Sequence, residues 1–170
     1  MTANYKLDAM LELRKFLWKR LVDLNIFDEE EYYSDNILET LIPIFPVQQL
    51  PEMNQFLSGK KHIVYDKIGL SYEDNWMICC EQILFTIYST EISDINEIRN
   101  FMTDEFRRMD DSARDINKWN GLSDKFKFYN VFIADISPTS PSEELKGFYS
   151  ADVILETKYS RILDSAGRFL

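Results

Sequence analysis

Few residues in this chain have the types and spacing that chemistry requires. His62 is the one histidine among 170 residues, and the two cysteines, Cys79 and Cys80, are adjacent. A zinc site needs about four nitrogen or sulfur ligands, and histidine-based catalysis needs partner side chains. Neighbouring strand residues point to opposite faces, so the two thiols are poorly placed to form a disulfide. We predict a strand-end histidine and two core thiols, in a protein made in a reducing cytoplasm, with no metal site.

Motifs that bind phosphate or position a nucleophile are absent from the sequence. Neither a glycine-rich dinucleotide motif nor a P-loop occurs, and the basic turn at residues 58–61 lacks the flanking glycines of such motifs. No G-x-S-x-G motif occurs either. Acidic pairs along a helix, such as Glu97 and Asp104, are more often solvated than catalytic. The sequence therefore predicts a protein that is not an enzyme, with no catalytic residue and no cofactor.

Composition and charge bound the class of protein. The chain has 29 Asp and Glu against 19 Lys and Arg, a formal net charge of -10, and 45% of its residues are hydrophobic. This is enough apolar material for one domain, which we expect over residues 1–170, with residues 164–170 as a C-terminal tail. Binding to DNA over a broad surface is not expected, because it needs clustered cations. The acidic charge either keeps the protein soluble or suits a passage through which DNA slides.

No segment of the sequence predicts insertion into a membrane. The N-terminal residues are amphipathic and charged, without the continuous apolar stretch of a signal peptide. No window approaches the roughly 18 apolar residues of a membrane span. We therefore expect no contact with a membrane.

Hydrophobic periodicity predicts two long helices. The first covers residues 5–24. The second covers residues 92–114, with Ser93 as its N-cap and a break near residues 110–112, where acidic residues oppose the helix dipole. A further helical turn is expected to end at Gly121. The apolar stripe of the second helix consists of Ile95, Ile98, Met102, Phe106 and Met109.

Extended segments are predicted in the first half of the chain. Residues 28–35 are expected to form a solvated acidic connector. Residues 37–47 contain two prolines and predict an edge or irregular strand. Residues 62–68 predict a short strand. Residues 76–90 are apolar at both alternating sets of positions, which predicts a central strand covered on both faces.

Two more strands complete the predicted sheet. Residues 125–136 and 148–162 alternate in polarity and are joined by a loop at residues 137–147 that shows little helical pattern, so they predict an antiparallel pair. In the first of them, we place Phe132 on the same face as Phe126. The expected fold class is α+β, a mainly antiparallel β-sheet with helices packed on one face.

Apolar and basic residues outside the regular elements mark a candidate protein interface. Residues 48–60 predict a loop whose apolar side chains either tuck beneath it or bind a partner. The chain's 12 Phe, nine Tyr and three Trp likewise either fill a two-sided core or serve protein–protein contacts. The candidate interface residues are Met53, Phe56, Leu57, Lys60, Lys61, Arg107, Arg108, Arg161, Phe169 and Leu170.

A resemblance to a known family is carried by four stretches of the sequence. They are residues 46–76, 79–102, 106–119 and 149–165. The predicted elements occur in this order: a helix, a strand with Tyr-Asp, a long strand ending in Tyr-Ser, a helix, a strand, and a final strand with Lys-Tyr-Ser-Arg. This order is similar to that of the tail terminators of T-even-like contractile-tailed bacteriophages of marine bacteria. These are also described as tail-completion and sheath-stabiliser proteins. The resemblance spans about residues 5–165.

The resemblance implies a non-enzymatic structural virion protein with a tail-terminator-like fold. Such proteins form a homo-hexameric ring that caps the tail tube, ends tube and sheath polymerisation, and provides the platform for neck proteins. The implied partners are the tail tube protein, the tail sheath protein and a neck protein, with genomic DNA only passing through the lumen. The implied location is the tail or neck of the virion, after assembly in the host cytoplasm. Alternatives are a neck adaptor, a sheath-linked protein of the same virion, or a small cytoplasmic enzyme or ligand-binding domain.

Overall fold

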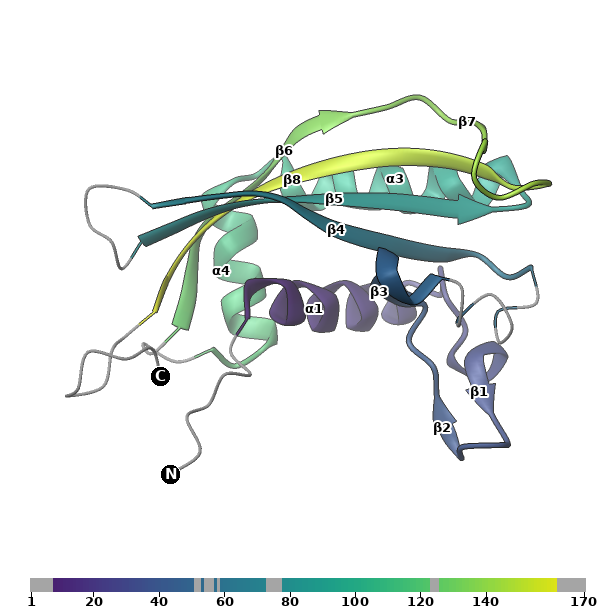
Figure 1. Cartoon of the computed structure of the whole chain (residues 1–170). Coiled ribbons are helices and arrows are strands. Elements are labelled where there is room, and N and C mark those ends of the chain that lie inside the picture. Colours follow the sequence, from purple (N-terminus) through teal and green to yellow (C-terminus); the bar gives the residue numbers. More distant parts are fainter. Residues whose placement is uncertain are drawn as a thin grey trace.

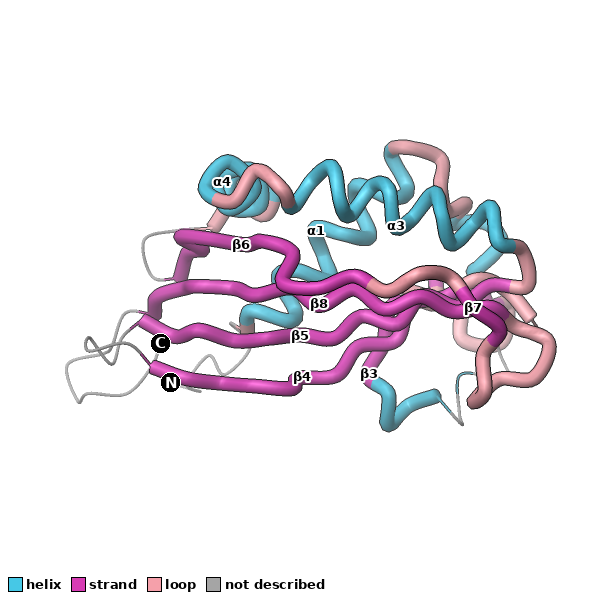
Figure 2. Tube along the Cα trace, turned by 90° about the horizontal axis from the view of Figure 1, so that it is seen from above, coloured by secondary structure: helices cyan, strands magenta, loops and turns pink. Residues whose placement is uncertain are grey.

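Helices α1, α3 and α4 lie on one side of a strongly twisted β-sheet in the computed structural model (Figures 1 and 2). The helices are α1 (Ala9–Asp23), α3 (Ile92–Phe106) and α4 (Asp110–Trp119). The structure describes residues 8–50, 53, 57, 59–72, 78–122 and 126–161. Within this part of the chain, no helix is long and apolar enough to cross a membrane.

The main sheet has the strand order β3-β4-β5-β8-β6, and the short strand β7 also pairs with β8. Only the β3–β4 pair is parallel among its described strands, whereas the other pairs are antiparallel. The predicted class, α+β with a mainly antiparallel sheet, is therefore confirmed. The strands are β3 (Ile44–Pro46), β4 (His62–Tyr72), β5 (Ile78–Ser89), β6 (Phe126–Ile136), β7 (Ser140–Pro141) and β8 (Tyr149–Arg161).

A small appendage precedes the main sheet. The 3-10 helix η1 (Glu29–Tyr32) leads into the antiparallel pair β1 (Tyr33–Ser34) and β2 (Glu39–Thr40), and a second 3-10 helix, η2 (Val47–Gln49), follows β3. The expectation of a fully solvated acidic connector is wrong at Tyr32. Its ring is buried, and its hydroxyl donates a hydrogen bond to the carbonyl oxygen of Lys61 at 2.6 Å.

Helix α1 is fixed at its start and along its buried face. The side chain of Asp8 caps the helix by accepting a hydrogen bond from the backbone N–H of Met10 at 2.8 Å. One turn later, Nε of Arg14 donates to the carbonyl oxygen of Ile44 at 2.6 Å. Arg14 interrupts the apolar stripe of the helix because it reaches the edge strand β3.

The second predicted helix is broken, as expected, although the break comes slightly earlier. Helix α3 ends at Phe106, and Met109 adopts a φ of 47° before α4 begins. Gly121, with a φ of 62°, follows α4 as predicted. Two details were wrong. Glu91 rather than Ser93 is the N-cap of α3, and Met109 is 49% exposed instead of continuing the buried stripe.

The helices cover one face of β5 only, so the prediction that this strand is covered on both faces is wrong. Ile83, Phe85 and Ile87 are fully buried, whereas Gln82 is exposed and Leu84 is half-buried on the opposite face. Apolar composition alone cannot distinguish these faces, because an aliphatic residue can be either buried or half-exposed in a folded protein. The molecule therefore has a helix-covered face and an opposite face that is open around Gln82 but buried at the end that carries His62 and Tyr88.

A β-bulge in β6 changes which of its residues face the helices. The register with β8 shifts between Phe128 and Asn130, so Val131 follows Phe126 and Phe128 into the core. The prediction that Phe132 shares this face is wrong, because one inserted residue reverses the alternation beyond it. The alternation predicted for β8 and its antiparallel pairing with β6 are confirmed.

Candidate interaction site at the β4 edge

Half of strand β4 lies at an open edge of the sheet. Strand β3 pairs only with the segment from Ile63 to Tyr65, so the following residues through Tyr72 have β5 on one side and no partner strand on the other within the described chain. Ile68 is 47% exposed and Leu70 is 58% exposed on this segment. An open edge presents backbone donors and acceptors that can pair with another strand. We call the segment from Asp66 to Tyr72 the β4 edge.

The opposite edge of the sheet is closed by a side chain. Nδ2 of Asn117, on α4, donates to the carbonyl oxygen of Phe128 at 2.9 Å, and the backbone N–H of Phe128 donates to Oδ1 of Asn117 at 2.9 Å. This amide therefore takes the place of a neighbouring strand at that point of β6. The two edges of the sheet differ, one being open and the other partly capped.

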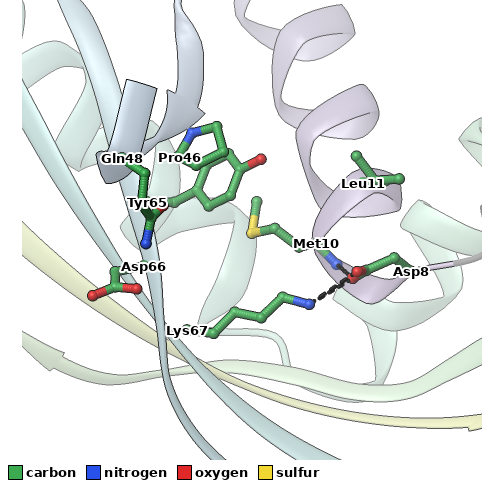
Figure 3. Close-up of a pocket in the computed structure, with 8 residues that line it drawn as sticks. All are labelled: Asp8, Met10, Leu11, Pro46, Gln48, Tyr65, Asp66 and Lys67. Atoms are coloured by element: carbon green, nitrogen blue, oxygen red, sulfur yellow. Dashed lines mark hydrogen bonds and ion pairs between the residues drawn. The ribbon is translucent and has the colours of Figure 1, made fainter. Parts of the chain in front are cut away.

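A cavity of about 320 Å³ lies where β3 ends and the β4 edge begins (Figure 3). One part of its wall is apolar and comes from the start of α1 and the neighbouring strands. The other part carries carboxylate, amide and ammonium groups. The lining residues are Asp8, Met10, Leu11, Pro46, Gln48, Tyr65, Asp66 and Lys67. We call this cavity the edge pocket.

Lys67 connects the edge pocket to the core. Its ammonium lies 2.9 Å from Asp8 and 3.3 Å from Glu81, and Figure 3 shows the side chain reaching from β4 toward the start of α1. Burial lowers the pKa of Lys67, but the hydrogen bond to Asp8 and the charge of Glu81 outweigh burial and leave this pKa above its ordinary value. Glu81 also accepts a hydrogen bond from the hydroxyl of Tyr159 at 2.8 Å. Two carboxylates against one ammonium leave the group with a net negative charge.

His62 is held in an aromatic cluster on the face of the sheet opposite the helices. It is 1% exposed and stacks on Phe45 and Tyr88, with ring centroids 5.6 and 5.2 Å away. Its Nδ1 lies 2.9 Å from the carbonyl oxygen of Lys60, whereas its buried Nε2 has no hydrogen-bond partner in the part of the chain that the structure describes. Burial lowers the pKa of His62, and the hydrogen bond to Lys60 opposes this shift only in part. The prediction of a strand-end residue is confirmed, and the ring serves the packing of the strand.

We expect His62 to make the protein less stable in mild acid. The unfolded chain takes up a proton at this residue near its ordinary pKa of 6.5, whereas the folded protein resists protonation. The free energy of unfolding should therefore fall as the pH drops below 6.5, by at most roughly 1.4 kcal/mol per pH unit from this group. Urea unfolding from pH 7.5 to 5.5 would measure the effect. The His62→Phe variant should show a shallower pH dependence, and identical slopes would contradict the assignment.

The prediction of a loop over residues 48–60 is wrong for several described residues, because Gln48 and Gln49 belong to η2 and Leu50, Met53 and Leu57 are helical. The apolar side chains of Met53 and Leu57 turn inward. Leu57 is 3% exposed and belongs to the core, so the expectation of an exposed side chain is wrong for this residue. Met53 is partly buried against the same core. Of the two loop alternatives, the tucked arrangement applies to both residues. Phe56 lies outside the described residues.

The predicted basic residues fall into two separate groups. The ammonium groups of Lys60 and Lys61 lie 5.5 and 5.3 Å from the ring centres of Tyr32 and Phe27, and Lys61 also lies 3.6 Å from Asp94. Lys60 therefore contacts the appendage, whereas Lys61 contacts the segment before η1 and helix α3. Arg107 and Arg108 lie together after α3.

The second group engages acidic residues close by in the chain. Arg107 lies 3.8 Å from Asp104, and Arg108 lies 3.2 Å from Glu105 and 2.5 Å from Asp115. The structure does not bring these arginines to the edge pocket. The backbone of Arg161 ends β8, and its side chain, Phe169 and Leu170 lie outside what the structure describes.

The β4 edge and the edge pocket were missed by the sequence prediction. The strand was predicted over residues 62–68, but it continues to Tyr72. A signal was present in Pro46, because a proline cannot donate a ladder hydrogen bond and marks the point where β3 stops. Among the described residues, no group of three or more His, Cys, Asp or Glu side chains is arranged to hold a metal ion.

The chain matches no protein-family model, and no curated protein matches it. The relationship to tail terminators therefore rests on the sequence resemblance. The geometry of the site is an open strand edge beside a cavity.

Proposed function

We propose that this chain is a structural subunit of a phage virion, a tail terminator that closes into a hexameric ring on the tail tube. The observation that carries the proposal is the difference between the two edges of the sheet. One edge is open beside a pocket, and the other is capped by Asn117. The hexameric state and the position on the tube come from the resemblance.

The difference between the edges supports a contact between unlike surfaces. A ring forms when one patch of each subunit meets a different patch of the next subunit, and the rotation closes. The β4 edge can accept an extended segment, whereas Asn117 already occupies backbone groups of β6 at Phe128. In this proposal the β4 edge is the receiving surface, and the neighbour supplies a segment from elsewhere in its chain. This is the arrangement that a closed ring requires.

The charge of the chain suits the same role. A formal net charge of -10 disfavours adhesion to DNA, so a ring of such subunits would let the genome pass through its lumen. The expected partners are the tail tube protein below, the sheath protein around and a neck protein above.

Incubation with isolated tail tubes tests the proposal. The protein should bind the open end of each tube and stop its growth, as seen by electron microscopy with added tube subunits. Tubes that grow at the same rate with and without the protein would contradict a terminator. A neck adaptor or sheath-linked protein has the same fold class, and the height and copy number of the chain in a virion map would separate these roles.

Removal of residues 164–170 should separate folding from assembly. Residues 164–170 follow β8, the last described strand, so we expect the truncated protein to retain its unfolding midpoint. Its association should be weakened, because the tail is part of the predicted interface. Circular dichroism in urea and sedimentation velocity would measure the two properties. A truncated chain that unfolds would show that the tail belongs to the core.

A further inference from the structure

The β4 edge and the edge pocket together define the segment that would fit them. The edge favours an extended backbone, since its hydrogen-bonding groups without a partner strand among the described residues lie along a strand, which one β-bulge interrupts between Lys67 and Gly69. The pocket beside it combines the apolar side chains of Met10, Leu11 and Tyr65 with the carboxylates of Asp8 and Asp66. A basic side chain with apolar neighbours is complementary to this mixture.

The chain itself contains such a segment beyond its last described strand. Residues 162–170 read Ile-Leu-Asp-Ser-Ala-Gly-Arg-Phe-Leu, with Arg168 directly followed by Phe169 and Leu170. The side chains of this segment carry one positive and one negative charge, in a chain whose formal net charge is -10. It is therefore less strongly repelled by an acidic pocket than most of the protein surface.

We propose, building on the ring assembly above, that residues 162–170 of one copy bind the β4 edge of a neighbouring copy. The segment runs antiparallel to β4, because this direction brings Arg168 to the Asp66 end of the edge. Arg168 then meets the acidic side of the edge pocket. Phe169 and Leu170 meet its apolar side, where β3 ends. Ile68 and Leu70 are the exposed apolar residues that the added segment covers.

The reach of the segment favours a neighbouring copy over the same copy. The sheet register places Asp66 opposite Leu84 and Ile154, seven residues before the end of β8 at Arg161. At about 3.3 Å per residue and about 4.8 Å per strand, the outer side of the β4 edge lies about 27 Å from Arg161. The seven residues from Arg161 to Arg168 span about 24 Å at full extension. A segment that crosses the sheet by about 14 Å and then pairs along the edge for about 20 Å needs about 34 Å, so Arg168 does not reach the pocket of its own chain while pairing along the edge.

Two full-length variants test the proposal by complementation. The edge-blocked chain carries Ile68→Lys and Leu70→Lys, which place two charges on exposed positions of the edge. The tail-blocked chain carries Arg168→Glu and Phe169→Asp. Each should associate at least about 30-fold more weakly than the natural chain. A Leu38→Lys chain is the matched control, because Leu38 is 73% exposed and does not lie on β4 or in the edge pocket.

An equimolar mixture of the two blocked chains should form heterodimers and no rings in sedimentation velocity. The intact tail of the edge-blocked chain can enter the intact edge of the tail-blocked chain, and the remaining surfaces are both blocked. Rings formed by either blocked chain alone, or a mixture that stays monomeric while the natural chain assembles, would overturn this inference. A natural chain that is monomeric at every concentration would instead overturn the proposed ring itself.

Discussion

Replacement of Phe106 by alanine should reduce the free energy of unfolding by about 3–5 kcal/mol. Phe106 is fully buried at the end of α3, and its ring centre lies 6.3 Å from that of Phe16 on α1. The substitution removes an aromatic contact between two helices and leaves a cavity that the surrounding sheet cannot fully close. Urea unfolding at pH 7.5, followed by tryptophan fluorescence, would measure the loss.

Met109→Ala is the matched control for this substitution. The sequence pattern places both residues on one apolar stripe, but Met109 is 49% exposed beyond the end of α3. Its replacement should change the free energy of unfolding by no more than about 0.5 kcal/mol. Equal losses at the two positions would mean that the helix continues unbroken to residue 109.

Replacement of Lys67 by methionine should cost about 2 kcal/mol near neutral pH. The substitution keeps most of the apolar stem but removes the ammonium that lies 3.3 Å from the carboxylate of Glu81. Glu81 is 4% exposed, so its charge would remain buried with only the hydroxyl of Tyr159 as a described side-chain partner. The loss would be smaller than for a fully buried pair, because the Lys67 side chain is 45% exposed.

The double variant Lys67→Met, Glu81→Gln isolates the cause. Removal of the buried charge should recover at least half of the lost stability in the same urea experiment. Arg114→Met is the control for loss of an exposed ion pair, since Arg114 and its partner Asp111 are 75% and 57% exposed, and it should cost under about 1 kcal/mol. If the double variant were less stable than Lys67→Met, the unpaired charge of Glu81 would not be the cause of the lost stability.

The regular elements of this fold could be predicted because their residues carry a clear periodicity. Strand β8 alternates between buried and half-buried residues along its length, and the break between α3 and α4 is marked by acidic residues at an unfavourable helix end. The antiparallel pairing of β6 with β8 followed from the loop between them, which shows little helical pattern. These are local properties, and the sequence records them directly.

The features that were predicted wrongly or missed depend on contacts between distant segments. Leu84 and Phe85 are equally apolar, and only the position of the helices decides that Phe85 is the buried one. The bulge before Asn130 reverses which residues of β6 face the helices, and no glycine or proline in the sequence marks its position. The β4 edge exists because β3 stops after three residues, which strand propensity does not reveal. The candidate site was therefore missed even though the strand that carries it was predicted.

The central claim is that the chain assembles into a ring. It is tested most directly by measuring the molar mass of the full-length protein at increasing concentrations. Light scattering should show a shift from single chains to a closed assembly of six, and electron micrographs of the same sample, alone or with tail tubes, should show rings with a central opening. A protein that remains a single chain at every concentration, and that leaves tail tubes bare, would contradict the account.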